Sequence, residues 1–319
     1  MFERLRRFHL EMDDKILLGV IGGVIVFSIV QAVVLPPYYL GFVSNILIFG
    51  IFGLAYNFLH GHTGLVSFGH AGFFVVGAYA GALTMEFTGY NAYLGFIACL
   101  VGSGIWAFFV GFIAVRLRGI YFAVITLALS MIPYFLIRDT FVGLTWGVMG
   151  WHLRGVIPFF FFDLDNPLLF LFFSLGVLIV VYIILRIIIN SSFGQCLKCI
   201  KDNELKLEGL GYNTRRLKYI AVTISGLFSG VAGYLYLLNN RSIFPELGLY
   251  FYSAKVIFVA LMGGVGSIIG PLLGTFIWFF IEEFLVTPGF LEITLGIAFL
   301  IVILRLPTGI IGLFKRYMR

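Results

Sequence analysis

Long apolar runs, separated by short polar breaks, make up nearly the whole chain. A helix that crosses the hydrocarbon of a membrane needs about 20 predominantly apolar residues. The run from Leu168 to Ile189 meets this requirement with a single ionisable residue, Arg186. The pattern predicts an all-α polytopic membrane protein. The ten transmembrane helices that we expect cover roughly residues 16–35, 39–59, 64–87, 92–115, 119–137, 167–189, 219–238, 252–266, 268–286 and 289–305.

Composition supports the same class of protein. Of the 319 residues, 61% are hydrophobic and 11% are charged, whereas soluble domains have about 25% charged residues. The formal net charge of +6 would suit nucleic acid or an anionic surface, but in a membrane protein basic residues mark the cytoplasmic side. We therefore expect membrane lipid, and no nucleic acid, around this chain.

The basic residues also orient the predicted helices. If the N-terminus is cytoplasmic, all of the 21 lysine and arginine residues fall on the cytoplasmic side except Arg138, Arg154, Arg241 and Lys255. The positive-inside rule then predicts that both termini are cytoplasmic. The regions that we expect are an amphipathic cytoplasmic N-terminus (1–15), a transmembrane domain (16–306) with an extracellular cap (138–166) and a cytoplasmic loop (190–218), and a basic cytoplasmic tail (307–319).

Two glycine-broken segments occupy matching places in the two halves of the chain. Ten spans with a large basic loop after the sixth predict a 5+5 inverted repeat, a design that many transporters use. Broken helices in a membrane are tolerated where the backbone is buried in protein or lines a wet path. Close helix packing through small residues is the alternative explanation. The residues expected to line a translocation pathway are Gly64, Ser67, Gly69, His70, Gly263, Gly264, Gly266 and Ser267.

The basic loop has the pattern of two short amphipathic helices. Its apolar residues at helical spacing are Leu197, Ile200, Leu207 and Leu210. Asp202 is placed to begin the second helix, and Gly209 and Gly211 to end it. We interpret the loop as a docking surface for a soluble partner. The alternative is an interfacial helix that lies on lipid headgroups.

The chain contains no recognisable catalytic motif. It has no Gly-x-x-x-x-Gly-Lys-Ser/Thr motif for binding ATP phosphates, and no Gly-x-Ser-x-Gly or His-Glu-x-x-His. The cluster of His60, His62 and His70 brackets a predicted turn and lacks a fourth zinc ligand, and the pair Cys196 and Cys199 has no second pair. We therefore expect no metal site, no cofactor and no enzymatic activity in this chain.

The loop also resembles a known family. Ser192, Phe193, Gly194, Leu197, Ile200, Asp202, Asn203, Glu204, Leu210 and Gly211 match the coupling motif of branched-chain amino acid ABC permeases, in the larger of their two homologous permease types. The segments 64–70, 116–129 and 262–271 are also similar to that family, so the resemblance covers almost the whole chain. Gln195, Cys196, Cys199 and Lys201 depart from the motif, which leaves open which ATPase the loop would fit.

The resemblance implies a permease subunit of an importer for branched-chain or related amino acids, located in the bacterial inner (plasma) membrane. Its expected partners are a homologous second permease, two ATPase subunits that bind ATP and Mg, and a periplasmic or extracellular substrate-binding protein. The residues expected to couple to the ATPases are Phe193, Gly194, Lys201, Asp202, Asn203, Glu204 and Gly211. Two alternatives remain: an ABC permease for urea or amides, and an ion-coupled secondary transporter with a buried ionisable relay.

Overall fold

The computed structural model describes residues 38–155, 158–159 and 162–285, together with residues 19, 22, 23, 296, 297, 300 and 309–311. The predicted N-terminal segment (1–15), first span (16–35), last span (289–305) and tail (307–319) lie outside the described residues, apart from those isolated positions. The remaining eight predicted spans can be compared with the structure.

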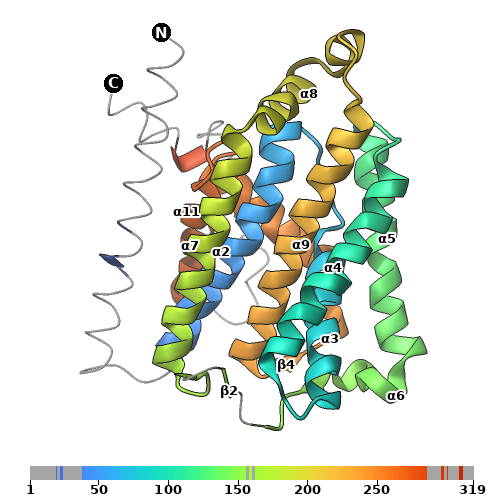
Figure 1. Cartoon of the computed structure of the whole chain (residues 1–319). Coiled ribbons are helices and arrows are strands. Elements are labelled where there is room, and N and C mark those ends of the chain that lie inside the picture. The colour runs from blue at the N-terminus through green and yellow to red at the C-terminus, as the bar shows by residue number, and fades with distance from the viewer. Residues whose placement is uncertain are drawn as a thin grey trace.

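Long helices lie side by side and form most of this part of the chain (Figure 1). They are α2 (Tyr38–Thr63), α3 (His70–Phe87), α4 (Ala92–Ala114), α5 (Ile120–Phe135), α7 (Pro167–Asn190), α8 (Ser192–Gly209), α9 (Thr214–Asn240), α10 (Tyr250–Gly263) and α11 (Gly270–Phe280). Short helical turns are η1 (Leu136–Thr140), α6 (Val142–Thr145), η2 (Gly147–Met149), η3 (Pro245–Gly248) and η4 (Ile281–Leu285).

Five helices of the described part are long and apolar enough to cross a membrane: α2, α4, α5 with η1, α7 and α9. Each of the eight predicted spans contains a helix, so the all-α prediction is confirmed. The predicted turn at residues 60–63 is wrong, because α2 continues through Thr63 and carries His60 and His62 in its last turn. Residues 64–69 of the third predicted span are not helical.

The centre of the bundle is built from α2, α3 and α9. In α9 the small residues Gly226, Gly230 and Gly233 let the backbone approach α3 and α4 closely, and a Cβ at Gly233 would overlap the carbonyl oxygen of Phe74. Such contacts between small residues are how membrane helices associate without a hydrophobic driving force. On the outer side, α4 exposes large apolar side chains such as Ile105 and Phe112, as expected for a surface solvated by lipid.

The end opposite α8 is closed by short elements (Figure 1). The strand β1 (Trp151–His152) pairs antiparallel with β4 (Ser242–Ile243), and β2 (Pro158–Phe159) pairs with β3 (Phe162–Asp163). Trp151 is buried and its Nε1 donates to Glu86 at 2.6 Å, so it holds the cap region onto α3.

Candidate functional site

The polar helix α8 forms one end of the molecule and is bent into two parts (Figure 1). Ser191 accepts a hydrogen bond from the backbone N–H of Gly194 and caps the first part. Asn203 has an extended backbone, with φ −164° and ψ 99°, and its side chain accepts from the N–H of Lys206. Asn203 therefore caps the second part, the position that the sequence analysis gave to Asp202.

The second part of α8 ends in a glycine cap. Gly211 has φ +86°, a conformation that glycine adopts without steric cost. Its N–H donates to the carbonyl of Glu208 at 2.9 Å, and the N–H of Tyr212 donates to Leu207 at 3.3 Å. These two bonds make a Schellman motif and satisfy carbonyls that the helix end leaves free. The prediction that Gly211 ends this helix is confirmed.

The apolar face of α8 packs against the bundle. Leu197, Ile200 and Leu207 are at most 5% exposed, as the helical spacing predicted. Leu210 is 75% exposed, so its assignment to this face is wrong. It lies at the C-cap, where the chain leaves the helix and the 3.6-residue period no longer decides which way a side chain faces. Both parts of α8 are therefore packed against the bundle.

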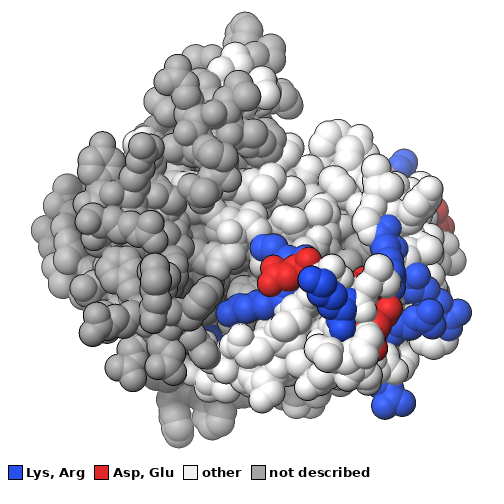
Figure 2. Space-filling model, turned by 90° about the horizontal axis from the view of Figure 1, so that it is seen from above, with Lys and Arg blue, Asp and Glu red and all other residues white. Residues whose placement is uncertain are grey.

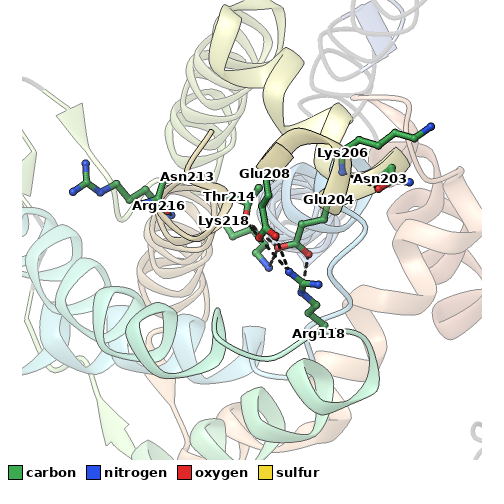
Figure 3. Close-up of polar contacts among 9 residues, drawn as sticks. All are labelled: Arg118, Asn203, Glu204, Lys206, Glu208, Asn213, Thr214, Arg216 and Lys218. Carbon is green, nitrogen blue, oxygen red and sulfur yellow. Dashed lines mark hydrogen bonds and ion pairs between the residues drawn. The ribbon is translucent and has the colours of Figure 1, made fainter. Parts of the chain in front are cut away.

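Five side chains from three segments join beneath the second part of α8 (Figure 3). Glu204 receives Lys218 Nζ at 2.6 Å and Arg118 Nε at 3.4 Å. Glu208 receives Arg118 Nη2 at 3.1 Å and the hydroxyl of Thr214 at 2.7 Å. Lys218 is only 2% exposed. We call these five residues the Glu204 cluster; it ties α8 to the start of α9 and to the turn between α4 and α5.

The Glu204 cluster also lowers the pKa of one of its members. The hydrogen bond from Thr214, followed by the nearby Arg118, holds the pKa of Glu208 below its usual value. A lowered pKa means that the ionised carboxylate stabilises the folded state at neutral pH. This contribution is lost only when the pH falls through the lowered pKa, so Glu208 keeps its charge throughout the physiological range.

The first part of α8 makes a separate contact with α2. Lys201 Nζ donates to the carbonyl oxygen of Gly61 at 2.9 Å. Gly194, at the joint between α7 and α8, is buried, and a Cβ there would overlap the carbonyl oxygen of Ile189. Phe193 is partly buried against the core. Phe193 and Gly194 therefore shape the joint and do not form an exposed contact surface.

The predicted coupling residues thus divide into two groups. Asp202, Asn203 and Gly211 are exposed at the surface, whereas Glu204 turns inward to the Glu204 cluster. The sequence analysis did not single out Arg118, Glu208, Thr214 or Lys218. Arg118 and Lys218 were counted only as charges on one side of the membrane, and no local pattern connects them to Glu204. Figure 2 shows this end of the molecule, where Lys and Arg side chains surround fewer acidic ones.

The two glycine-broken segments both lie against α2. Ser67 and His70 are buried, and His70 Nε2 lies 2.8 Å from Ser225 Oγ, which donates to the carbonyl of Ala55 in α2. In the second segment the carbonyl of Ser267 accepts from Asn57 of α2 at 2.6 Å. A Cβ at Gly69 would overlap the backbone of Thr126, and one at Gly263 that of Gly270. Gly64, Gly264 and Gly266 have positive φ.

Ionisable groups also meet within the bundle, away from α8. Lys255 of α10 pairs with Glu282 of η4 at 2.8 Å, and Lys255 Nζ lies over the rings of Phe49 and Phe279. Across the described residues, no group of three or more His, Cys, Asp or Glu side chains is placed to hold a metal ion. His60 and His62 lie on α2, whereas His70 begins α3.

The fold and this site define a class first: a multi-pass membrane protein whose apolar helices carry an anchored polar helix, α8, at one end. The chain belongs to the family described as branched-chain amino acid transport system / permease component, whose model matches residues 38–306. The match covers all the long helices described above, so the resemblance seen in the sequence is confirmed.

Two curated relatives are similar to this chain. It is 29% identical over 247 residues to the high-affinity branched-chain amino acid transport system permease protein LivM of Escherichia coli (strain K12). It is 28% identical over 247 residues to the LivM protein of Salmonella typhimurium (strain LT2). Each alignment covers 69% of this chain and 57% of the relative, so the chain spans little more than half the length of these relatives. No solved structure matches the chain.

Proposed function

We propose that this chain is a permease subunit of an ABC importer that moves branched-chain or related amino acids across the bacterial inner (plasma) membrane. Family membership supports the permease role, and the printed names of both LivM relatives support the substrate class. Separate ATPase subunits energise the transport, since the chain has no phosphate-binding Gly-x-x-x-x-Gly-Lys-Ser/Thr motif of its own.

One observation carries the proposal: α8 is an exposed polar helix that is held to the bundle on two sides. Asp202 and Asn203 are exposed at the bend, while the Glu204 cluster and Lys201 hold the flanking parts. A helix that only rested on lipid headgroups would need no buried ion pair to the transmembrane helices. An anchored helix with an exposed bend suits a groove on a soluble ATPase subunit, because a displacement of the bend is transmitted to the helix bundle.

The partners follow from this role. Two ATPase subunits, which bind ATP and Mg, engage the α8 end, and a substrate-binding protein engages the opposite end. A homologous second permease completes the membrane part, and this chain is not itself catalytic. The basic face at the α8 end (Figure 2) supports a cytoplasmic location for that end. The distribution of Lys and Arg along the sequence supports cytoplasmic termini.

The full architecture that we propose has ten transmembrane helices in a 5+5 inverted repeat. The support is that the two glycine-broken segments belong to the third and eighth predicted spans, which a 5+5 repeat relates to each other. In the structure, residues 64–69 precede α3, residues 264–269 follow α10, and the second segment accepts a hydrogen bond from Asn57 of α2. Such breaks at corresponding places mark the pathway in repeat-built transporters. In this proposal Ser67, His70, Gly264 and Ser267 border the route of the substrate.

An ion-coupled secondary transporter is the second candidate, and the pair of Lys255 and Glu282 within the bundle is what favours it. Intramembrane ionisable residues are commonly parts of ion pathways. Permeases for urea or amides would share the coupling helix and differ in the binding protein. Reconstituted vesicles separate these candidates: the importer requires ATP and ATPase subunits, whereas the secondary transporter requires a proton or sodium gradient.

The docking role of α8 is tested by charge reversal at its bend. Asp202→Arg should lower the stimulation of ATP hydrolysis by loaded binding protein by about tenfold or more. The reason is that a reversed charge at the contact faces groups of its own sign on the ATPase, and such a juxtaposition is costly. Asp202→Arg should also weaken the copurification of the ATPase subunits with the permease. Asp139→Arg, an exposed carboxylate reversed at the opposite end, is the matched control and should leave this copurification unchanged. Equal stimulation in Asp202→Arg and wild type would remove α8 from the contact with the ATPases.

A further inference from the structure

A buried amide joins α2 to the turn between α10 and α11. Asn57 is 1% exposed, and its Nδ2 donates to the carbonyl oxygen of Ser267 at 2.6 Å. Its Oδ1 accepts from the N–H of Gly266 at 3.4 Å. Both ends of one side chain therefore hold the same glycine turn, whose backbone groups would otherwise be left without these partners inside the bundle.

This joint lies one helical turn from the contact between α8 and α2. Gly61, whose carbonyl accepts from Lys201, is four residues from Asn57 on α2. A Cβ at Gly61 would meet Asn57 Oδ1 at 2.7 Å and the backbone nitrogen of Gly266 at 3.2 Å. The three segments thus meet at Gly61 with no space for a larger residue.

The hairpin beyond the turn is packed as one unit. A Cβ at Gly263 would overlap the carbonyl oxygen of Gly270, so α10 and α11 touch backbone to backbone. The first turn of α11 also rests on α2, where a Cβ at Gly53 would lie 2.8 Å from the Pro271 side chain. Interfaces this close are not continuously deformable, so a displacement at the turn moves the hairpin as a body.

The two parts of α8, before and after the bend at Asn203, contact different helices. Lys201, before the bend, contacts α2 and so adjoins the α10–α11 turn, while Glu204 and Glu208, after it, hold α9 and the α4–α5 turn. We propose that Asn57 is a positioning residue through which movement of the first part of α8 reaches the segment 264–269. The proposal rests on the ABC importer function, and it specifies how movement of α8 is transmitted to the α10–α11 hairpin during transport.

The test compares two asparagines on the same helix in the assembled importer. Asn57→Leu keeps the size of the side chain and removes both hydrogen bonds, so the substrate moved per ATP hydrolysed should fall about tenfold, as expected for the loss of a buried hydrogen-bonded coupling. Basal ATP hydrolysis and copurification of the subunits should persist. Asn45→Leu is the control. Asn45 lies in the other half of α2, where it exchanges hydrogen bonds with Asn240 of α9, and the variant should keep the wild-type ratio of substrate moved per ATP hydrolysed.

A second variant disturbs the joint without removing its polar groups. Gly61→Ala should wedge Asn57 away from Gly266 and lower the same ratio, and it decides the question if Asn57→Leu does not assemble. If both Asn57→Leu and Gly61→Ala keep the wild-type ratio of substrate moved per ATP hydrolysed, the role of Asn57 is overturned and the importer function is not. Failure of the wild-type assembly to couple ATP hydrolysis to transport would instead overturn the importer function.

Discussion

Two carboxylates on α8, one turn apart, contribute very differently to the stability of the fold. Glu204 faces Lys218, whose side chain is 2% exposed. Removing one partner of a buried ion pair costs about 3–5 kcal/mol, because the other charge stays buried and unpaired. Glu208 and Arg118 are 36% and 54% exposed, and exposed pairs contribute only about 0–1 kcal/mol. The link between α8 and α9 therefore depends mainly on Glu204.

Glu204→Gln should destabilise the purified protein by about 3–5 kcal/mol, since it leaves the Lys218 cation buried beside an uncharged group. Thermal unfolding in detergent measures this as a lowered Tm. Glu208→Gln is the matched control and should change the Tm little. The double variant Glu204→Gln with Lys218→Met should recover most of the loss, because no unpaired charge remains. A Tm for Glu204→Gln equal to that of Glu208→Gln would show that Lys218 does not depend on Glu204.

Among the elements, the helices could be predicted because a membrane imposes a length and a polarity on each apolar run. The two-part form of α8 could also be predicted, from the 3.6-residue spacing of Leu197, Ile200 and Leu207. The inward turn of Glu204 could not, because its partners Arg118 and Lys218 come from distant segments. The continuation of α2 through His62 was missed because a polar cluster resembles a break when its burial is unknown.

The joint between α7 and α8 should be the most sensitive point of α8 to a small change in volume. Gly194→Ala places a methyl group on the carbonyl of Ile189, which is backbone and cannot turn aside. We expect a lowered Tm and a reduced stimulation of ATP hydrolysis by loaded binding protein. Gly209→Ala, in the same helix, meets nothing within 4 Å and should be neutral or stabilising by about 1 kcal/mol. Indistinguishable behaviour of the two variants would contradict close packing at this joint.

In the molecule as a whole, α2 is the common support of every segment assigned to transport. It carries the contact with α8 at Gly61, the amide of Asn57 and the carbonyl of Ala55, which receives Ser225 beside His70. No local pattern in α2 revealed this, since it looks like an ordinary apolar span. Any movement that α8 imposes on the end of α2 is therefore positioned to act on both glycine-broken segments.

The proposed pathway can be tested by thiol labelling in a variant that lacks Cys99, Cys196 and Cys199. Ser67 and Ser267 are 1% and 6% exposed, so cysteines placed there should resist small polar reagents in the resting importer. If these segments border the substrate route, labelling should appear once ATP and loaded binding protein drive the transport cycle, because alternating access wets the path. Ser44→Cys, equally buried on α2 and outside both segments, should stay protected throughout. Uniform protection of all three positions during turnover would place the route elsewhere and leave the two broken segments with a packing role.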